Sequence, residues 1–376
     1  MTLKVGIPRE TAEGERRVAI EPTVIKKLGK LGAEVLVEKG AGLAALMPDE
    51  LFAGATIVES ATDLAQQADI ILRVQTPTVD EVDKMRDNSV LVGTLLAHKH
   101  ADVVARLNEK NITSFAMELV PRISRAQSMD VLSSQAAVAG YKAAIMGADL
   151  APRFFPMLTT AAGTIRPSKV IVIGVGVAGL QAIATAKRLG AMVEAYDVRP
   201  ETKEQIESLG AKAIELSISA TGEGGYAREL TDEEKQQQQQ ELAGYIAQAD
   251  VLITTASVPG RPAPKIIPEA TVDGMKKGAV IIDLAAESGG NCTLTQPGQT
   301  LEHNGVIIHA PLNVASQVPV HASEMYAKNL FNFLSPMIID GEFKPDFDDE
   351  VISGALLTHE GEIRHQATRE QLEGES

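Results

Sequence analysis

The sequence predicts an α/β protein made of two Rossmann-like domains with parallel sheets, and a dinucleotide-binding cleft between the domains. The chain has 376 residues, and because one domain takes about 150 residues, this length suits two domains. Short apolar runs typical of buried strands alternate with helical patterns, which favours parallel sheets covered by helices on both faces. A helix that closes on glycine and leads into a strand occurs at 31–35 and again at 189–193, so we expect two related units.

The first domain is expected to comprise residues 1–132 and 311–376. Pro22 suits the first turn of a helix, because its φ is already close to the helical value. A later helical pattern covers 322–334 and would return the chain to this domain. The strands of the domain are predicted at 3–7, 34–38, 68–74 and 89–95.

The second domain is expected to comprise residues 133–310. It would begin with an Ala-rich helix over 133–150, which could serve as the hinge between the domains. The run KVIVI at 169–173 predicts a strand buried on both faces, and a helix should follow as far as Leu189. The segment TDEE at 231–234 is a helix start, so the five glutamines after it are interpreted as a solvated helix face. Further strands are predicted at 192–197, 251–254, 280–284 and 306–309.

The net charge and the single cysteine limit the possible classes of function. The formal net charge is −15, and so acidic a surface repels phosphate backbones and anionic lipid headgroups, which argues against nucleic-acid binding. Cys292 is the only cysteine and cannot form an intramolecular disulfide, which indicates a reducing compartment. The apolar run 170–186 is too short for a membrane span and contains three glycines, so direct membrane insertion is not expected.

A GxGxxG motif follows the predicted strand at 169–173 and opens the next helix. The motif is the continuous run Gly174, Val175, Gly176, Val177, Ala178 and Gly179. The glycines allow a tight turn, a close approach of pyrophosphate to the backbone, and packing of the helix on the strand, while the helix N-terminus attracts the phosphates.

The carboxylate of Asp197 lies 23 residues after Gly174, at the end of the next strand, where it can accept both ribose hydroxyls. Its charge would repel a 2′-phosphate, so the motif predicts that NAD(H) binds here rather than NADP(H). Arg199 leaves the alternative open, because an arginine near this position can accommodate a 2′-phosphate; a solvated surface arginine is the simpler interpretation.

A polar segment at 121–134, PRISRAQSMDVLSS, precedes the predicted hinge helix. Its donors and acceptors include Arg122, Gln127, Asp130 and Ser133, and their density at a domain junction suits a cleft that orients a polar ring or a diphosphate. The alternative is a polar linker in which a serine caps the next helix.

Four segments together resemble one family. They are PRISRAQSMD with the following LSSQ, GVGVAGLQA after the strand, GGYA at 224–227, and IIDLAAESGGNC at 281–292. The combination is similar to the soluble NAD(H)-binding alpha component (domain I) of proton-translocating NAD(P) transhydrogenase, over essentially the whole chain. The alanine dehydrogenase family shares the fold and the amino-terminal GIPRE and RRVA pattern, and is the main alternative.

The chemistry of amino-acid oxidation distinguishes the two families, because it needs a general base and an anchor for the substrate carboxylate. At the positions that match the substrate-binding lysine and the catalytic histidine of alanine dehydrogenases, this chain has Gln75 and Leu96. Their arginine is retained as Arg17, and their aspartate is matched by Glu287. Transhydrogenation needs no such base, because hydride passes between two nicotinamide rings, so the missing pair favours transhydrogenase.

The resemblance implies roles for individual residues. Arg122, Asp130 and Ser133 match residues around the nicotinamide end of bound NAD(H), and Gln127 is implied to reach toward NADP(H) of the partner component. Tyr226 matches the aromatic residue of a mobile loop that closes over the nucleotide.

The resemblance also implies the assembly. The expected enzyme is an NAD(P)+ transhydrogenase of the Si-specific/Re-type, proton-translocating class, with NAD(H) bound by this chain and NADP(H) bound by a partner component. A homodimer is implied, cytoplasmic and held at the inner face of the cytoplasmic membrane through partner subunits, one of which spans the membrane. The alternatives are an alanine dehydrogenase-like oxidoreductase and a non-catalytic nucleotide-sensing module.

Overall fold

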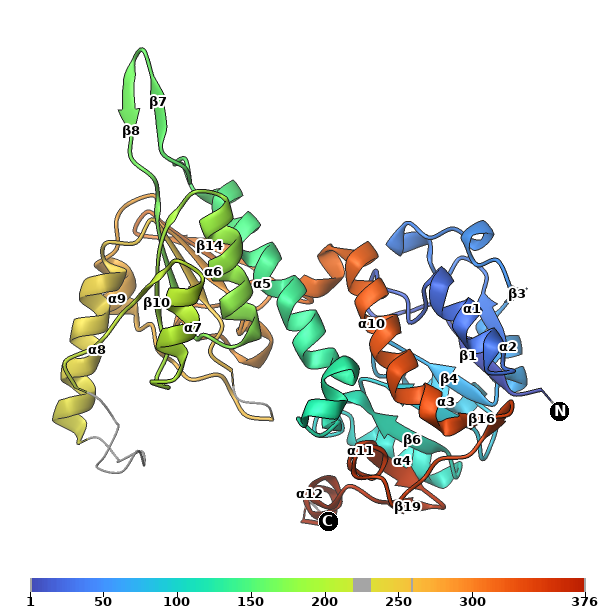
Figure 1. Ribbon diagram of the computed structural model, residues 1–376. Helices are drawn as coiled ribbons and strands as arrows, with labels where there is room; N and C mark the ends of the chain where they lie inside the picture. Colours follow the sequence, from blue (N-terminus) through green and yellow to red (C-terminus); the bar gives the residue numbers. More distant parts are fainter. Residues whose placement is uncertain (1, 219–230, 258–259, 375–376) are drawn as a thin grey trace. The chain divides into compact units, whose positions relative to one another are not determined.

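The computed structural model describes residues 2–218, 231–257 and 260–374 (Figure 1). The chain divides into two compact units: Met1–Gln135 with Ala315–Ser376 form the first, and Ala136–Val314 form the second. Each unit has helices packed on a large, mainly parallel sheet. The α/β class with two Rossmann-like units is therefore confirmed.

An eight-stranded sheet forms the centre of the first unit. Six parallel strands follow the order β3-β2-β1-β4-β5-β6, and the antiparallel strands β18 and β19 extend the sheet beyond β6. The strands are β1 (Lys4–Ile7), β2 (Glu34–Glu38), β3 (Ala55–Val58), β4 (Ile70–Leu72), β5 (Val90–Gly93), β6 (Thr113–Ala116), β18 (Leu356–His359) and β19 (Glu362–Ile363). The helices are α1 (Pro22–Lys30), α2 (Ala61–Gln67), α3 (Val79–Lys84), α4 (Ala101–Glu109), α10 (Pro319–Leu334), α11 (Glu350–Ala355) and α12 (Gln366–Gly374), and β16 (Ile338–Ile339) pairs with β17 (Glu342–Phe343). All four strands predicted for this unit are confirmed.

Local sequence explains where these elements begin and what they bury. α1 begins at Pro22, as predicted, and the side chain of Glu21 caps it by accepting the Thr23 N–H. β4 and β5 are buried on both faces, which is why they appear in the sequence as uninterrupted apolar runs. α10 returns the chain to this unit and packs Phe333 edge-on against Phe115, with ring centroids 5.5 Å apart.

A seven-stranded sheet forms the centre of the second unit. Its order is β11-β10-β9-β12-β13-β15-β14, and every pair is parallel except β14 with β15. The strands are β9 (Lys169–Ile173), β10 (Met192–Tyr196), β11 (Lys212–Ala213), β12 (Val251–Thr254), β13 (Val280–Asp283), β14 (Thr300–His303) and β15 (Val306–His309). The helices are α6 (Val177–Arg188), α7 (Thr202–Ser208), α8 (Asp232–Ile246) and α9 (Glu269–Asp273). The strand order reverses between β9 and β12, the position at which Rossmann sheets bind ligands beyond the carboxyl ends of their strands.

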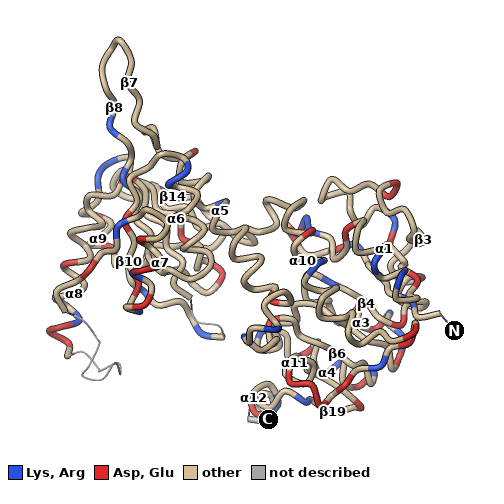
Figure 2. Tube along the Cα trace, viewed as in Figure 1, with Lys and Arg blue, Asp and Glu red and all other residues tan. Residues whose placement is uncertain are grey.

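α5 (Val131–Leu150) is a continuous helix of 20 residues that begins in the first unit and ends in the second. It confirms the helix predicted at 133–150. Among the described residues, no helix combines the length and the apolar character that a membrane span requires. Figure 2 shows acidic and basic residues interspersed over both units.

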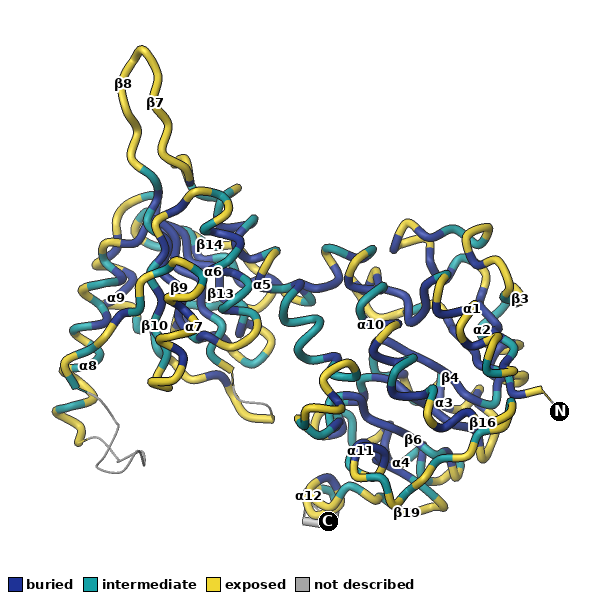
Figure 3. The backbone as a smooth tube through the Cα atoms, viewed as in Figure 1, coloured by how far each residue is buried: buried dark blue, intermediate teal, exposed yellow. Residues whose placement is uncertain are grey.

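A two-stranded hairpin, β7 (Leu158–Thr160) with β8 (Gly163–Ile165), extends away from the sheet of the second unit. All six strand residues are exposed, and Figure 3 shows the hairpin as a yellow arm. Phe154 and Met157, which lead into it, are exposed as well. The sequence did not predict this element, because its exposed strands, LTT and GTI, carry no apolar run of the kind that marks a buried strand.

Candidate functional site

The GxGxxG segment, residues 174–179, is called the glycine turn; it leads from β9 into the first residues of α6 and lies at the carboxyl ends of the strands of the second sheet. Gly174 has φ +89°, a value that strains any residue with a side chain. A Cβ on Gly179 would lie 2.0 Å from the carbonyl oxygen of Gly174, so only glycine allows α6 to pack this closely on the turn. Both positions therefore behave as the motif predicts.

The N-terminus of α6 presents backbone donors to solvent. Gly176 is the N-cap, and the first backbone bond of the helix is donated by Leu180 to Gly176. Val177 is 42% exposed, and Gly176 is also exposed. Because the first N–H groups of a helix have no partner within it, this end can bind the oxygens of a diphosphate.

Asp197 follows β10 directly and turns back onto the glycine turn. Its Oδ2 accepts the Val175 N–H at 2.7 Å, and its side chain is 7% exposed. Burial alone would raise the pKa of Asp197, but hydrogen bonds from the Arg199 side chain and from the Val175 N–H outweigh it and hold the pKa below its usual range. The carboxylate is thus ionised at neutral pH and joined to the turn.

Arg199 is committed mainly to Asp197. Its Nε and Nη2 donate to the two carboxylate oxygens at 2.9 and 3.0 Å, and Nη2 also donates to the Val175 carbonyl at 3.2 Å. About half of the side chain is exposed. A guanidinium that already donates to a carboxylate is less available to donate to a 2′-phosphate.

A cavity of about 340 Å³ lies next to Asp197. Its lining comes from the end of β10, from α7, from the segment after β11 and from α8, and includes Tyr196, Ile206, Ile214, Leu216 and Gln238. Apolar walls with a carboxylate at one side suit an adenosine whose ribose faces Asp197.

Residues that the sequence does not single out support the glycine turn and the segment beside it from the neighbouring strands. The Thr255 hydroxyl, directly after β12, donates to the Gly174 carbonyl at 2.8 Å. The buried Asn291 side chain holds the Ala256 backbone through both its oxygen and its nitrogen. Asp283, at the end of β13, accepts the Thr254 hydroxyl at 3.0 Å. The signal that could have located Thr255 is the strand order, which places the end of β12 beside the turn.

The polar segment forms a separate cavity in the first unit. It includes a 3₁₀ helix, η4 (Ser124–Met129), and its residues Arg122, Gln127, Asp130 and Ser133 all line a cavity of about 460 Å³. Arg122 and Gln127 are exposed side chains. The structure therefore brings the four predicted residues of this segment together.

Asp130 and Ser133 are bonded to each other at the start of α5. The carboxylate of Asp130 accepts the Ser133 N–H at 2.8 Å and the Ser133 hydroxyl at 2.6 Å. This is the geometry of a helix N-cap, with Asp130 in the capping role that the linker interpretation gave to a serine. Arg125, in the same segment, instead holds the segment to α11 by pairing with Asp349 at 2.8 and 2.9 Å.

Two of the positions that match the alanine dehydrogenase substrate site, Arg17 and Gln75, are joined in one internal network through Glu15. Arg17 pairs with Glu15 through two hydrogen bonds, at 2.8 and 2.6 Å, and donates to Gln135 at 2.9 Å. Gln75 also donates to Glu15, at 2.7 Å. Glu287, on the second unit, accepts the backbone N–H of Asn313 at 2.7 Å.

Leu96 stands in a turn with φ +42°, and its N–H and that of Leu95 donate to Glu118. Burial raises the pKa of Glu118 against the effect of these bonds. An apolar side chain thus occupies the position that matches the catalytic histidine of alanine dehydrogenases.

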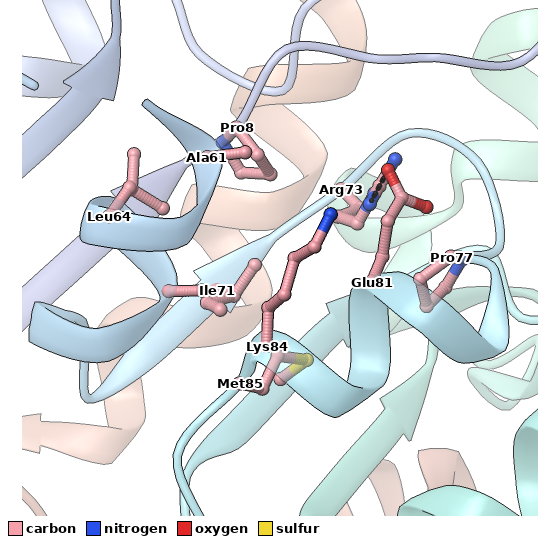
Figure 4. Close-up of a pocket in the computed structure, with 10 residues that line it drawn as sticks. Pro8, Ala61, Leu64, Ile71, Arg73, Pro77, Glu81, Lys84 and Met85 are labelled. Atoms are coloured by element: carbon pink, nitrogen blue, oxygen red, sulfur yellow. Dashed lines mark ion pairs between the residues drawn. The ribbon is translucent and has the colours of Figure 1, made fainter. Parts of the chain in front are cut away.

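The reversal point of the first sheet is filled by charged side chains of the chain itself. Arg73, which follows β4, is 4% exposed and pairs with Glu10 at 3.3 Å and with Glu81 at 2.9 Å. Figure 4 shows Arg73 and Glu81 in the small pocket beside α2 and α3, with Lys84 alongside. This pocket holds about 30 Å³, room for water rather than for a dinucleotide. Tyr226 lies outside the described residues.

Comparisons with known proteins show which family the chain is similar to. A model of the "Alanine dehydrogenase/PNT, N-terminal domain" matches residues 6–139, and one of the "Alanine dehydrogenase/PNT, C-terminal domain" matches residues 143–366. The first portion of NAD(P) transhydrogenase subunit alpha of Rhodospirillum rubrum is 49% identical over 379 residues, covering 97% of this chain and 98% of that protein. The crystal structure of transhydrogenase from Sinorhizobium meliloti matches with a TM-score of 0.86 at 43% identity, covering 97% of this chain and 99% of that one. A structure of L-alanine dehydrogenase matches with a TM-score of 0.83 at 25% identity, covering 99% of both chains.

Proposed function

We propose that this chain, which belongs to the alanine dehydrogenase/PNT family, is the NAD(H)-binding alpha component of a proton-translocating NAD(P) transhydrogenase. Its relatives named NAD(P) transhydrogenase subunit alpha support this assignment. The observation that carries NAD(H) binding is the ionised carboxylate of Asp197, joined to the Val175 N–H of the glycine turn at 2.7 Å. There it accepts ribose hydroxyls and repels a 2′-phosphate.

The pairing of Arg17 and the residue types at positions 75 and 96 favour transhydrogenation over alanine oxidation. The Arg17 guanidinium is paired with Glu15, and an amide and an alkyl side chain replace the lysine and the histidine. NADH supplies hydride from its dihydronicotinamide ring and leaves as NAD+, while NADP+ accepts it and leaves as NADPH. Neither ring has to lose a proton to a protein base, so the absence of one is no disadvantage.

The polar segment is proposed to hold the reacting end of NAD(H). The guanidinium of Arg122 would bind NAD(H) in the ground state. Asp130 and Ser133, bonded to each other, would hold the start of α5 next to the nicotinamide. Gln127, an exposed amide, would reach toward NADP(H) on the partner component and align the two rings. The stereochemistry would be that of the Si-specific/Re-type class.

The assembly is proposed to contain two copies of this chain, a separate NADP(H)-binding component and a membrane-spanning component that holds them at the cytoplasmic face. The exposed hairpin offers apolar side chains for the contact between the copies: Met157 is 65% exposed and Ile165 is 45% exposed. Exposed apolar arms of this kind are typical of protein interfaces. Light scattering should give a dimer for the native chain and a monomer for Ile165→Glu with Met157→Glu.

Steady-state turnover tests the proposed function. The chain is mixed with the NADP(H)-binding component of a relative, and hydride transfer from NADH to an NADP+ analogue is followed by absorbance. The proposal expects transfer that depends on both proteins and no NADH formation from NAD+ and alanine. Turnover with alanine would identify an amino-acid oxidoreductase, and tight NADH binding with neither reaction would identify a sensing module.

A further inference from the structure

The backbone of α5 passes directly behind the glycine turn. A Cβ built on Gly140 would lie 2.0 Å from the carbonyl oxygen of Ala178 and 2.8 Å from its carbonyl carbon. Ala178 is the second residue of α6. A Cβ atom essentially never comes within 3.0 Å of an atom outside its own residue and its chain neighbours, and a backbone atom cannot move aside as the end of a long side chain can. Only glycine at position 140 allows this contact.

The end of β12 contacts the same turn. The Thr255 hydroxyl donates to the Gly174 carbonyl at 2.8 Å, and a Cβ on Gly174 would lie 2.8 Å from the Ala256 nitrogen. The turn is thus contacted by α5 at Ala178 and by the segment after β12 at Gly174.

We propose that Gly140 and Thr255 are positioning residues for nucleotide binding, and this inference rests on the proposed function. Gly140 fixes the first turn of α6 against α5, and Thr255 fixes the start of the glycine turn. Together they hold the backbone N–H groups that would bind the diphosphate of NAD(H) in the geometry that hydrogen bonds need. In this role Gly140 acts through the Ala178 backbone and needs no contact with the nucleotide.

The size of the expected effect follows from the geometry. An alanine at position 140 forces at least 1 Å of separation, the difference between the 2.0 Å contact and the 3.0 Å limit. In an N–H···O hydrogen bond the nitrogen and the oxygen lie only about 2.7–3.2 Å apart, so a shift of about 1 Å breaks the bonds to a diphosphate. We expect Gly140→Ala to weaken binding of NADH and ADP at least tenfold, and binding of adenosine, which has no phosphate, less than twofold.

Gly147→Ala is the matched control. Gly147 lies two turns further along the same face of α5, and its added Cβ would meet the Cγ1 atom of Val251 at 2.8 Å. This contact is to a side chain and is remote from the turn. The control should lower the melting temperature while leaving the affinities for NADH, ADP and adenosine within twofold.

Calorimetric titration of NADH, ADP and adenosine, with thermal unfolding of each variant, tests the proposal. Thr255→Val keeps the shape of the side chain and removes the hydroxyl, and it should weaken ADP binding at least threefold and spare adenosine. If Gly140→Ala does not fold, Thr255→Val decides the question. Equal losses for ADP and adenosine, or an unchanged ADP affinity, would overturn the positioning role. A native chain that binds neither NADH nor ADP would instead overturn the proposed function.

Discussion

Replacement of Asp197 by alanine should reduce the affinity for NADH and reverse some of the discrimination against NADPH. The carboxylate is ionised, largely buried and bonded to the Val175 N–H at 2.7 Å, and it engages the Arg199 guanidinium. The substitution removes the acceptor for the ribose hydroxyls, loosens the turn at Val175 and releases Arg199. The released guanidinium can then meet a 2′-phosphate that the native carboxylate repels.

Hydrogen bonds to a charged group contribute about 1.5–3 kcal/mol, which corresponds to roughly a 10- to 150-fold rise in the dissociation constant for NADH. The additional loss at Val175 places the expected value toward the upper end of that range. Because the chain contains no tryptophan, the emission of bound NADH can be followed without energy transfer from that residue. Titration of NADH and NADPH against both proteins gives the two affinities and their ratio.

Asp250→Ala is the control for this experiment. Asp250 directly precedes β12, at the amino ends of the strands of the same sheet, where it accepts the Lys169 N–H at 2.8 Å and pairs with Lys276 at 2.9 Å. Its removal should lower thermal stability and leave NADH affinity within twofold. The reasoning is refuted if native protein binds NADPH as tightly as NADH, or if Asp197→Ala binds NADH as the native protein does.

Three further predictions concern the first unit. Gln127→Asn should leave NADH affinity nearly unchanged and slow single-turnover hydride transfer in the complex at least tenfold, since misplacement by about 1 Å can cost about 100-fold in rate; a loss of affinity without a slower transfer would return Gln127 to a linker role. Arg122→Ala should weaken NADH binding as well as transfer, and unchanged titration curves would remove it from the site. The two hydrogen bonds from Arg125, together with the Val351 N–H, hold the pKa of Asp349 at about 2, so the stability they confer is complete above the unfolded pKa of about 3.9 and is lost as the pH falls through about 2. Arg125→Ala should raise the pKa of Asp349 toward 3.9 in a carboxyl NMR titration, and an unchanged value would contradict the pairing.

Much of the fold could be predicted because its signals are local. KVIVI at 169–173 is apolar on both faces, and the glycines after it are required by a backbone that has no room for a Cβ at Gly179. Pro22 and the TDEE sequence at 231–234 both start helices as expected. The exposed strands of the hairpin carry no apolar run, and β19 has only two residues, so neither gives a periodic signal.

The interior of the candidate site could not be predicted, because it depends on contacts between distant residues. The pairing of Arg17 with Glu15 is close in sequence, but Gln75 and Gln135 complete it from 60 and 118 residues away. The sequence could identify Asp130 as a candidate residue of the nucleotide site, but its hydrogen bond from Ser133 depends on where α5 begins. The contact of Gly140 with Ala178 joins two helices, and one glycine in an Ala-rich helix gives no sign of it.

Transfer of deuterium tests the central claim most directly. NADH that carries deuterium on the transferred position of its dihydronicotinamide ring is mixed in a single turnover with this chain and with an NADP(H)-binding component loaded with NADP+. Direct transfer between rings predicts NADPH that contains the deuterium, with none released to water and no need for alanine. Deuterium lost to solvent, or transfer that requires alanine or pyruvate, would contradict the account.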